Sequence, residues 1–142
     1  MMPQYFDKVS HCVLRVLVVL FVLLPLAAAA EKAQEKVVYL IVEESRLIAS
    51  NTLLSRFDEL KLDAKEKVVQ QREAEAVIVV VTNQRILGYG AHAPAWQPVR
   101  IRAGEQIVSV EAKDASASVL TSDRYLNFNG RRGTWAVKKK RL

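Results

Sequence analysis

A recurrence every 39 residues constrains the fold of this chain more than any other feature. Segments 37–50, 76–89 and 115–128 align without a gap at this spacing. The arginines that occupy the same place in the three segments are Arg46, Arg85 and Arg124. Self-similarity at a fixed period indicates a repeat architecture, in which each unit buries its hydrophobic face against its neighbours.

Two further landmarks keep the same spacing. Glu66 and Glu105 stand 39 residues apart, and each opens a short apolar alternation. An aromatic residue also follows each arginine after 11 positions, and the set is Phe57, Trp96 and Trp135. Because chance would not align so many landmarks at one period, we divide the chain into units. These units are 37–75, 76–114 and 115–142.

The residues within each unit are typical of short β-strands. The β-branched run 77–81 ends at Thr82, and the polar pair 83–84 connects it to a second apolar run. A third run begins near the aromatic landmark, and a turn at 103–104 leads to a fourth. Four antiparallel strands in about 40 residues make one propeller blade. The sequence therefore predicts an all-β domain over 31–142, built from three four-stranded, propeller-blade-like repeats.

Three observations bear on this prediction. Segment 55–75 is rich in Lys and Glu and favours a helix by propensity, but its alignment with 96–114 predicts strands. A β-trefoil also contains three units of four strands, and it is the main alternative fold. The third unit has room for three strands only, so we expect eleven strands with open edges.

The runs VVVTNQRILGY and GEQIVSVEA, with the strand that starts at Trp96 between them, resemble two families. The first comprises short bacterial exported repeat proteins with propeller-like units, in which a T-x-x-R turn and a Trp recur. This similarity covers 37–135. The second comprises bacterial PH-like and GRAM-like domains, where a T-N-x-R turn joins two early strands. It covers 77–112 and implies a PH-like barrel. Neither resemblance assigns a ligand, an activity or a functional residue.

Residues 1–30 have the pattern of an export signal. Two basic residues precede an apolar run at 16–24, and Ala28 and Ala30 form an A-x-A site for cleavage after Ala30. The sequence therefore predicts a signal peptide and an exported protein, either periplasmic or extracellular. The alternative is an inner-membrane anchor formed by the uncleaved residues 12–30.

The formal net charge of +6 is concentrated at one end of the chain. Residues 31–130 contain 13 basic and 14 acidic residues, whereas residues 131–142 contain six basic and no acidic ones. The last basic cluster is Lys138, Lys139, Lys140 and Arg141. This cluster predicts contact with an anionic surface, such as lipid headgroups. The alternative is a solvated edge strand that its lysines protect from pairing. No nucleic-acid partner is expected for an exported chain.

The repeated residues are the candidates for ligand binding. Arginine recognises carboxylate and phosphate bidentately, so one arginine in each unit suggests a ring that binds an anion. The alternative is that each arginine bonds turn carbonyls or a neighbouring repeat. The tryptophans suggest either stacking platforms for sugars or packing anchors between units. The candidate ligand-binding residues are Arg46, Arg85, Arg124, Trp96 and Trp135.

The sequence contains no pattern that indicates catalysis. P-loop, GxGxxG, HExxH, GxSxG and EF-hand motifs are all missing. His92 has no acidic residue or second histidine near it in its loop. Glu43 and Glu44 are adjacent on a predicted strand and would point to opposite faces. We therefore expect no catalytic residue, no metal and no cofactor.

These observations predict an exported, non-catalytic binding or assembly module with an unidentified ligand. The alternatives are a small repeat lectin that binds glycans, and an envelope enzyme or processing factor of an unrecognised type. Open strand edges and three repeats per chain also predict a homodimer, in which two chains complete a six-bladed ring.

Overall fold

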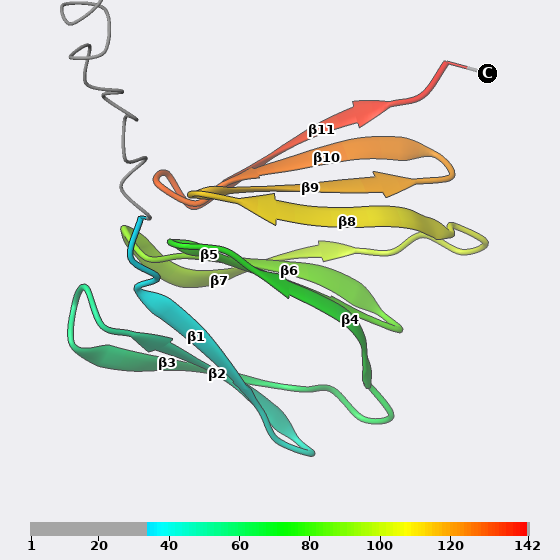
Figure 1. Ribbon diagram of the computed structural model, residues 1–142. Coiled ribbons are helices and arrows are strands. Elements are labelled where there is room, and N and C mark those ends of the chain that lie inside the picture. Colours follow the sequence, from blue (N-terminus) through cyan, green and yellow to red (C-terminus); the bar gives the residue numbers. More distant parts are fainter. Residues whose placement is uncertain (1–33, 142) are drawn as a thin grey trace, which may run out of the picture. The chain divides into compact units, whose positions relative to one another are not determined.

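The computed structural model describes residues 34–141. Within this range, eleven strands form three antiparallel sheets that lie one above another (Figure 1). The export signal predicted over 1–30 and the alternative anchor over 12–30 lie outside the described residues. Among residues 34–141, no helix has the length and apolar character needed to cross a membrane.

Each sheet is a meander of strands that follow one another along the chain. The first sheet contains β1 (Val38–Val42), β2 (Arg46–Asn51) and β3 (Arg56–Lys61). The second sheet contains β4 (Val68–Glu73), β5 (Val77–Thr82), β6 (Arg85–Gly90) and β7 (Ala93–Arg100). The third sheet contains β8 (Ile107–Lys113), β9 (Ser116–Thr121), β10 (Arg124–Asn129) and β11 (Thr134–Lys139).

The sheets are out of phase with the repeat units by one strand. β4 belongs to the first unit by sequence, but it pairs with β5 in the second sheet. β8 belongs to the second unit and pairs with β9 in the third sheet. The expected eleven strands are present, and among the described residues the sheet with three strands is the first one.

The propeller-blade-like, all-β arrangement is confirmed. The strand ladders of the described residues form three separate open sheets, and no ladder joins one sheet to the next. A β-trefoil and a PH-like barrel would both need strands of different units to close one barrel. Both alternative folds are therefore wrong.

The position of a sheet in the stack explains its pattern of burial. β5 reads VIVVVT and all six of its residues are buried, because the second sheet is covered on both faces. β9 and β10 alternate between buried and exposed residues, because only one face of the third sheet is covered. A continuous apolar strand and an alternating strand thus occupy equivalent places in successive sheets.

The helix-favouring segment 55–75 forms strands, as its alignment predicts. β3 pairs with β2 in register from Arg56 to Lys61, and β4 pairs with β5. Cross-strand hydrogen bonds and packing on a neighbouring sheet outweigh a local helix propensity of a few tenths of a kcal/mol per residue (about 0.7 at most).

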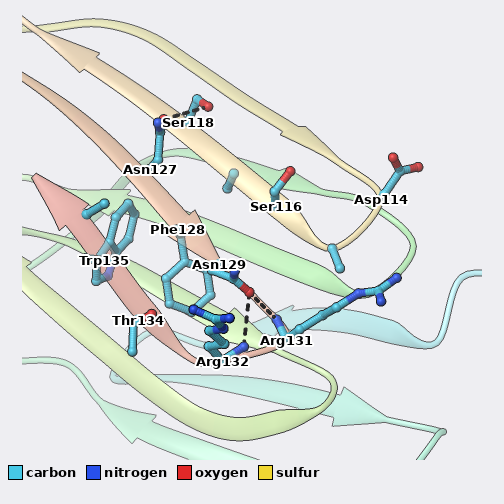
Figure 2. A pocket seen from close by; sticks show the side chains of 13 residues that line it. Asp114, Ser116, Ser118, Asn127, Phe128, Asn129, Arg131, Arg132, Thr134 and Trp135 are labelled. Atoms are coloured by element: carbon cyan, nitrogen blue, oxygen red, sulfur yellow. Dashed lines mark hydrogen bonds between the residues drawn. The ribbon is translucent and has the colours of Figure 1, made fainter.

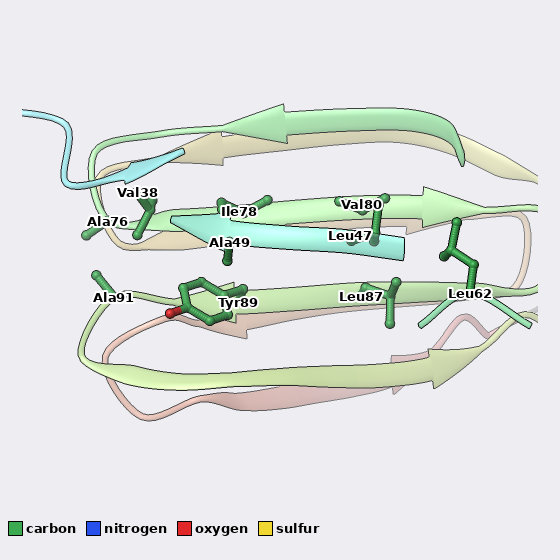
Figure 3. Close-up of a cluster of buried hydrophobic side chains, with 10 residues drawn as sticks. All are labelled: Val38, Leu47, Ala49, Leu62, Ala76, Ile78, Val80, Leu87, Tyr89 and Ala91. Atoms are coloured by element: carbon green, nitrogen blue, oxygen red, sulfur yellow. The ribbon is translucent and has the colours of Figure 1, made fainter. Parts of the chain in front are cut away.

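Two hydrophobic clusters fill the spaces between sheets. The cluster between the first and second sheets is shown in Figure 3, where Ala49 of β2 lies near Tyr89 of β6. Its buried members are Val38, Leu47, Ala49, Leu62, Ala76, Ile78, Val80, Leu87, Tyr89 and Ala91. The cluster between the second and third sheets consists of Val77, Val79, Val81, Ile86, Val110, Ala117, Val119, Leu126 and Phe128.

Two glycines allow the second and third sheets to approach closely. A Cβ atom at Gly88 would lie 2.7 Å from Cδ2 of Phe128, so the aromatic ring occupies the space of the missing side chain. A Cβ atom at Gly90 would lie 1.8 Å from the carbonyl oxygen of Gly130. The backbones of β6 and of the hairpin after β10 therefore touch directly.

The open edge of β1 is partly closed by a side chain of the second sheet. The backbone N–H of Leu40 donates to Oε2 of Glu73 at 3.1 Å. The same carboxylate pairs with Nζ of Lys36 at 2.8 Å. In the second sheet, the residue equivalent to Leu40 is Val79, which pairs with Arg72 of β4. In the first sheet, the carboxylate of Glu73 thus accepts the backbone N–H of Leu40 on the side where, in the second sheet, β4 pairs with β5.

Candidate functional site

The arginine of the third sheet lies in a buried cluster with a glutamate and a threonine. Nε and Nη2 of Arg124 donate to the two oxygens of Glu105 at 2.8 and 2.7 Å. Oγ1 of Thr121 donates to Glu105 at 2.6 Å and accepts the backbone N–H of Arg124 at 2.9 Å. Nη2 of Arg124 also donates to the carbonyl oxygen of Arg100 in the second sheet. The cluster therefore links the β9–β10 turn to the neighbouring sheet.

The second sheet repeats this arrangement. Nε and Nη2 of Arg85 donate to the two oxygens of Glu66 at 2.8 and 3.0 Å, and Oγ1 of Thr82 donates to Glu66 at 2.7 Å. Nη2 of Arg85 also donates to the carbonyl oxygen of Lys61 in the first sheet. The T-x-x-R turn thus has the same partners in both sheets.

These contacts hold both glutamates in the ionised form. Hydrogen bonds from Arg124 lower the pKa of Glu105 to about 2, although burial acts in the opposite direction. For Glu66, burial raises the pKa, but the hydrogen bonds from Arg85, Asp63 and Thr82 outweigh it and the net shift is downward. Each pair is therefore a permanent internal ion pair at neutral pH.

Arg46 of the first sheet has different surroundings. It lies at the surface and pairs with Glu43 and with Glu59, whose Oε2 is 3.0 Å from its Nη1. The sequence predicted an anion site at Arg46, Arg85 and Arg124. The structure places the latter two against internal carboxylates, so their forks are already occupied, and the ligand role stays a prediction.

The two tryptophans contact the preceding sheet. Nε1 of Trp96 donates to the carbonyl oxygen of Asp58 at 3.1 Å, and Nε1 of Trp135 donates to that of Gln97 at 2.9 Å. The ring centroid of Trp96 lies 5.3 Å from that of Tyr89. Trp135 stands in the same relation to an aromatic ring of β10, at 4.9 Å. This geometry favours packing anchors over sugar platforms.

A polar network accompanies Trp96 between the first two sheets. The hydroxyl of Tyr89 donates to Oδ2 of Asp58 at 2.6 Å, and Nδ2 of Asn51 donates to the same hydroxyl at 3.1 Å. Burial, followed by the hydrogen bond to Asp58, raises the pKa of Tyr89 to about 12. The phenol therefore stays protonated and serves as a fixed donor.

The aromatic landmark of the first sheet has no such neighbour. Phe57 is 67% exposed, whereas Trp96 and Trp135 are partly buried against a preceding sheet. Phe57 and Tyr39 flank Ser50 on one face, and the next cross-strand pair on that face is Ile41 and Ile48. We call these five residues the outer face of the first sheet. Tyr39 and Ile41 are also exposed.

The third sheet carries a hollow of about 660 Å³ on its outer side (Figure 2). Most of the side chains that it exposes are polar. Ser118 hydrogen-bonds Asn127 across two strands, and Oδ1 of Asn129 accepts the backbone N–H groups of Arg131 and Arg132. We call this site the polar hollow. It is lined by Asp114, Ser116, Ser118, Asn127, Asn129, Arg131, Arg132, Thr134 and Ala136, together with the apolar residues Ala115, Ala117, Phe128 and Trp135.

The basic cluster predicted from the sequence lies along and just beyond the edge strand β11. Lys138 and Lys139 are exposed, and so is Arg141. Nζ of Lys140 donates to the carbonyl oxygen of Thr121 and lies 5.4 Å from the ring centroid of Tyr125. Three exposed cations therefore lie along one edge of the third sheet. Contact with an anionic surface stays a prediction.

Among residues 34–141, no group of three or more His, Cys, Asp or Glu side chains is placed to hold a metal ion. His92 lies in the two-residue loop between β6 and β7. The described part of the chain thus offers no assembled metal centre.

Two features of the site were not predicted from the sequence. Glu66 aligns with Glu105, and each arginine follows its glutamate by 19 positions, but the ion pairs between them were not predicted. The polar hollow was not predicted either. One signal for the hollow was present in the sequence. At positions equivalent by the 39-residue repeat, the third sheet has the polar residues Ser118 and Asn127 where the second sheet has the buried Val79 and Gly88.

Comparisons with known proteins place the chain in no family. No family model matches it, and no match is found among curated proteins. Among solved structures, the chain is similar to the N-terminal domain of Nup159, with a TM-score of 0.44 and 14% sequence identity. The match covers 76% of this chain but only 29% of the Nup159 domain chain. No residue role is transferred from that protein.

Proposed function

We propose that this chain is an exported, non-catalytic assembly module that associates with further copies of itself through the outer face of its first sheet. The observation that carries the proposal is the exposure of Phe57. Its equivalents in the other two sheets lie against a preceding sheet and donate a hydrogen bond to it. The first sheet therefore presents a packing surface of the same kind without a described neighbour.

The chemistry of this face supports association with a protein surface. Tyr39, Ile41 and Phe57 are 44%, 43% and 67% exposed on one side of a single sheet. Contiguous apolar side chains rimmed by charges mark interaction surfaces. The rim here is the ion pair of Arg46 with Glu43 and Glu59.

Replacing Phe57 with serine is expected to weaken self-association at least about 30-fold, because a central aromatic anchor commonly contributes 2 kcal/mol or more. Sedimentation velocity over a micromolar concentration series measures the effect. Val69→Ser is the matched control, because Val69 is 68% exposed but lies on β4 of the second sheet. A wild-type protein that stays monomeric, or equal weakening by both variants, would contradict the proposal.

A second candidate function is attachment to an anionic surface, supported by the exposed cations Lys138, Lys139 and Arg141 on one edge. Each basic residue near an anionic membrane contributes roughly 1 kcal/mol. Changing all three residues to glutamine should therefore lower the affinity for phosphatidylserine vesicles by roughly two orders of magnitude.

The control for this test removes the same charge elsewhere. Lys61, Lys65 and Lys67 are exposed and lie around the β3–β4 connection. Changing these three residues to glutamine lowers the net charge equally. If both triple variants lose the same affinity in vesicle co-sedimentation, the binding depends on net charge and the edge of β11 is not a site.

A further inference from the structure

We propose that the polar hollow of the third sheet receives the outer face of the first sheet of a second copy, so that two chains close into a ring of six sheets. This inference rests on the proposed function, because it names the surface to which the exposed face around Phe57 binds. The 39-residue repeat relates each interface between sheets to the next.

The two described interfaces are equivalent under the repeat. Trp96 of the second sheet donates to the carbonyl oxygen of Asp58 in the first sheet. Adding 39 to both numbers gives Trp135 and Gln97, which form the same bond between the third and second sheets. At each interface, a tryptophan of the later sheet thus enters the interface and donates to a backbone carbonyl oxygen of the earlier sheet. We call these the entering and the receiving positions.

A further shift of 39 residues relates the third sheet of one chain to the first sheet of a second copy. The receiving position after Asp58 and Gln97 is Ala136, which lines the polar hollow. The entering position that precedes Trp96 is Phe57, which is exposed. The hollow and the exposed aromatic side chain are therefore the two unfilled halves of one repeated contact.

At the proposed interface, the large and the small residue lie on opposite sides from where they lie at the two described interfaces. A large aromatic ring faces a small residue at the described interfaces, where Phe128 packs on Gly88. The corresponding residues of the proposed interface are Ser50 on the entering side and Asn127 on the receiving side. At the proposed interface, the larger residue, Asn127, therefore belongs to the third sheet and the smaller one, Ser50, to the first sheet of the second copy. Both side chains can form hydrogen bonds.

Charges at the edge of the proposed interface are also complementary. The side chains of Arg85 and Arg124 each donate to a carbonyl oxygen of the preceding sheet, and the next carbonyl in the repeat is that of Lys139. In the ring, Arg46 of the second copy would lie near the carbonyl oxygen of Lys139. Its carboxylate partners Glu43 and Glu59 would lie there as well. Lys138, next to Lys139, replaces the apolar residue of earlier sheets and brings a cation to these carboxylates.

A closed ring satisfies the geometry of such a contact. The contact joins two different faces, so it is heterologous and leads either to a closed ring or to an open filament. Propellers typically close with about four to eight blades, and two chains of three sheets lie within that range. In the ring, the same interface occurs twice. The outer face of the first sheet and the polar hollow of the third sheet are then covered in both chains.

Cross-linking tests the interface at its centre. A Cβ atom at Gly88 would lie 2.8 Å from Cγ of Phe128. In the proposed interface, we therefore expect the equivalent positions 127 and 50 to approach closely enough for a disulfide, whose Cβ atoms are about 3.5–4.5 Å apart. The variant Ser50→Cys/Asn127→Cys, prepared in the full chain with Cys12→Ser, is oxidised gently. We expect a covalent dimer with two disulfides, seen by non-reducing mass spectrometry.

The other outcomes are decisive as well. A covalent ladder beyond the dimer would show open stacking and overturn the ring. The single variant Ser50→Cys should remain uncross-linked, because a dimer formed by it alone would join two first sheets to each other. If no cross-link forms while the association still depends on Phe57, the hollow is not the receiving surface and the proposed function survives. If the association does not depend on Phe57, the proposed function fails first.

Discussion

Replacing Arg124 with methionine is expected to lower the free energy of unfolding by about 3–5 kcal/mol, the usual result of removing one partner of a buried ion pair. Both carboxylate oxygens of Glu105 lose their donors from Arg124, and the side chain of Glu105 is fully buried. Nη2 of Arg124 also bonds the carbonyl oxygen of Arg100, so a contact between two sheets is lost as well. Equilibrium urea denaturation measures the change.

A double variant and a matched surface variant complete this test. Adding Glu105→Gln to Arg124→Met removes the unpaired charge and should recover part of the lost stability. Arg46→Met changes the same repeat position, but Arg46 is exposed, so its effect should lie within the error of the measurement. Equal losses for Arg46→Met and Arg124→Met would contradict the buried position of the pair.

The same pair predicts the direction of the pH dependence. Because the folded state lowers the pKa of Glu105 from 4.5 to about 2, its stabilising contribution is complete above about pH 4.5. The contribution is lost as the pH falls towards 2, where the folded protein also takes up the proton. Glu66 is shifted in the same direction. In the Arg124→Met variant, the part of the acid sensitivity that comes from Glu105 should disappear.

Replacing Gly90 with alanine is expected to destabilise the protein by about 3 kcal/mol or more, because the new methyl group has no space. Its position lies 1.8 Å from the carbonyl oxygen of Gly130. Since that atom belongs to the backbone, the second and third sheets must move apart. Their shared hydrophobic cluster, which contains Val77 and Phe128, would then lose contacts. Urea denaturation again measures the loss.

Gly104→Ala separates steric crowding from backbone strain. Gly104 has a φ of +78°, but no heavy atom lies within 4 Å of a Cβ atom built there. Its replacement should cost only about 1–2 kcal/mol, the strain of a left-handed conformation. A loss at Gly90 no larger than that at Gly104 would contradict the close approach of the two sheets.

Much of the fold could be predicted because strand signals are local. The β-branched run of β5 and its two-residue connection to β6 indicate a hairpin without reference to the rest of the chain. The 39-residue period then extended this assignment to 55–75, where propensity alone favours a helix. Alignment within one chain supplied information that a single segment lacks.

The candidate site could be predicted only in part. The repeated arginines and tryptophans were found as landmarks, but their partners lie 19 and 38 positions away, at Glu105 for Arg124 and at Gln97 for Trp135. A periodic residue is equally visible whether it binds a ligand or packs on the next repeat. The polar hollow was not predicted, because a loss of apolar residues at one end becomes meaningful only when the covered faces are known.

The sequence by itself determined the period of 39, the strands and the tight turns, because alternation and turn chemistry act between near neighbours. Only the tertiary structure decided that β4 leaves its unit to join β5 and that, within 34–141, the sheet with three strands is the first one. It also decided that Glu105 and Arg124 are buried together while Phe57 remains exposed. These choices depend on hydrogen bonds and contacts between distant segments, and a local pattern does not encode which face of a strand will be covered.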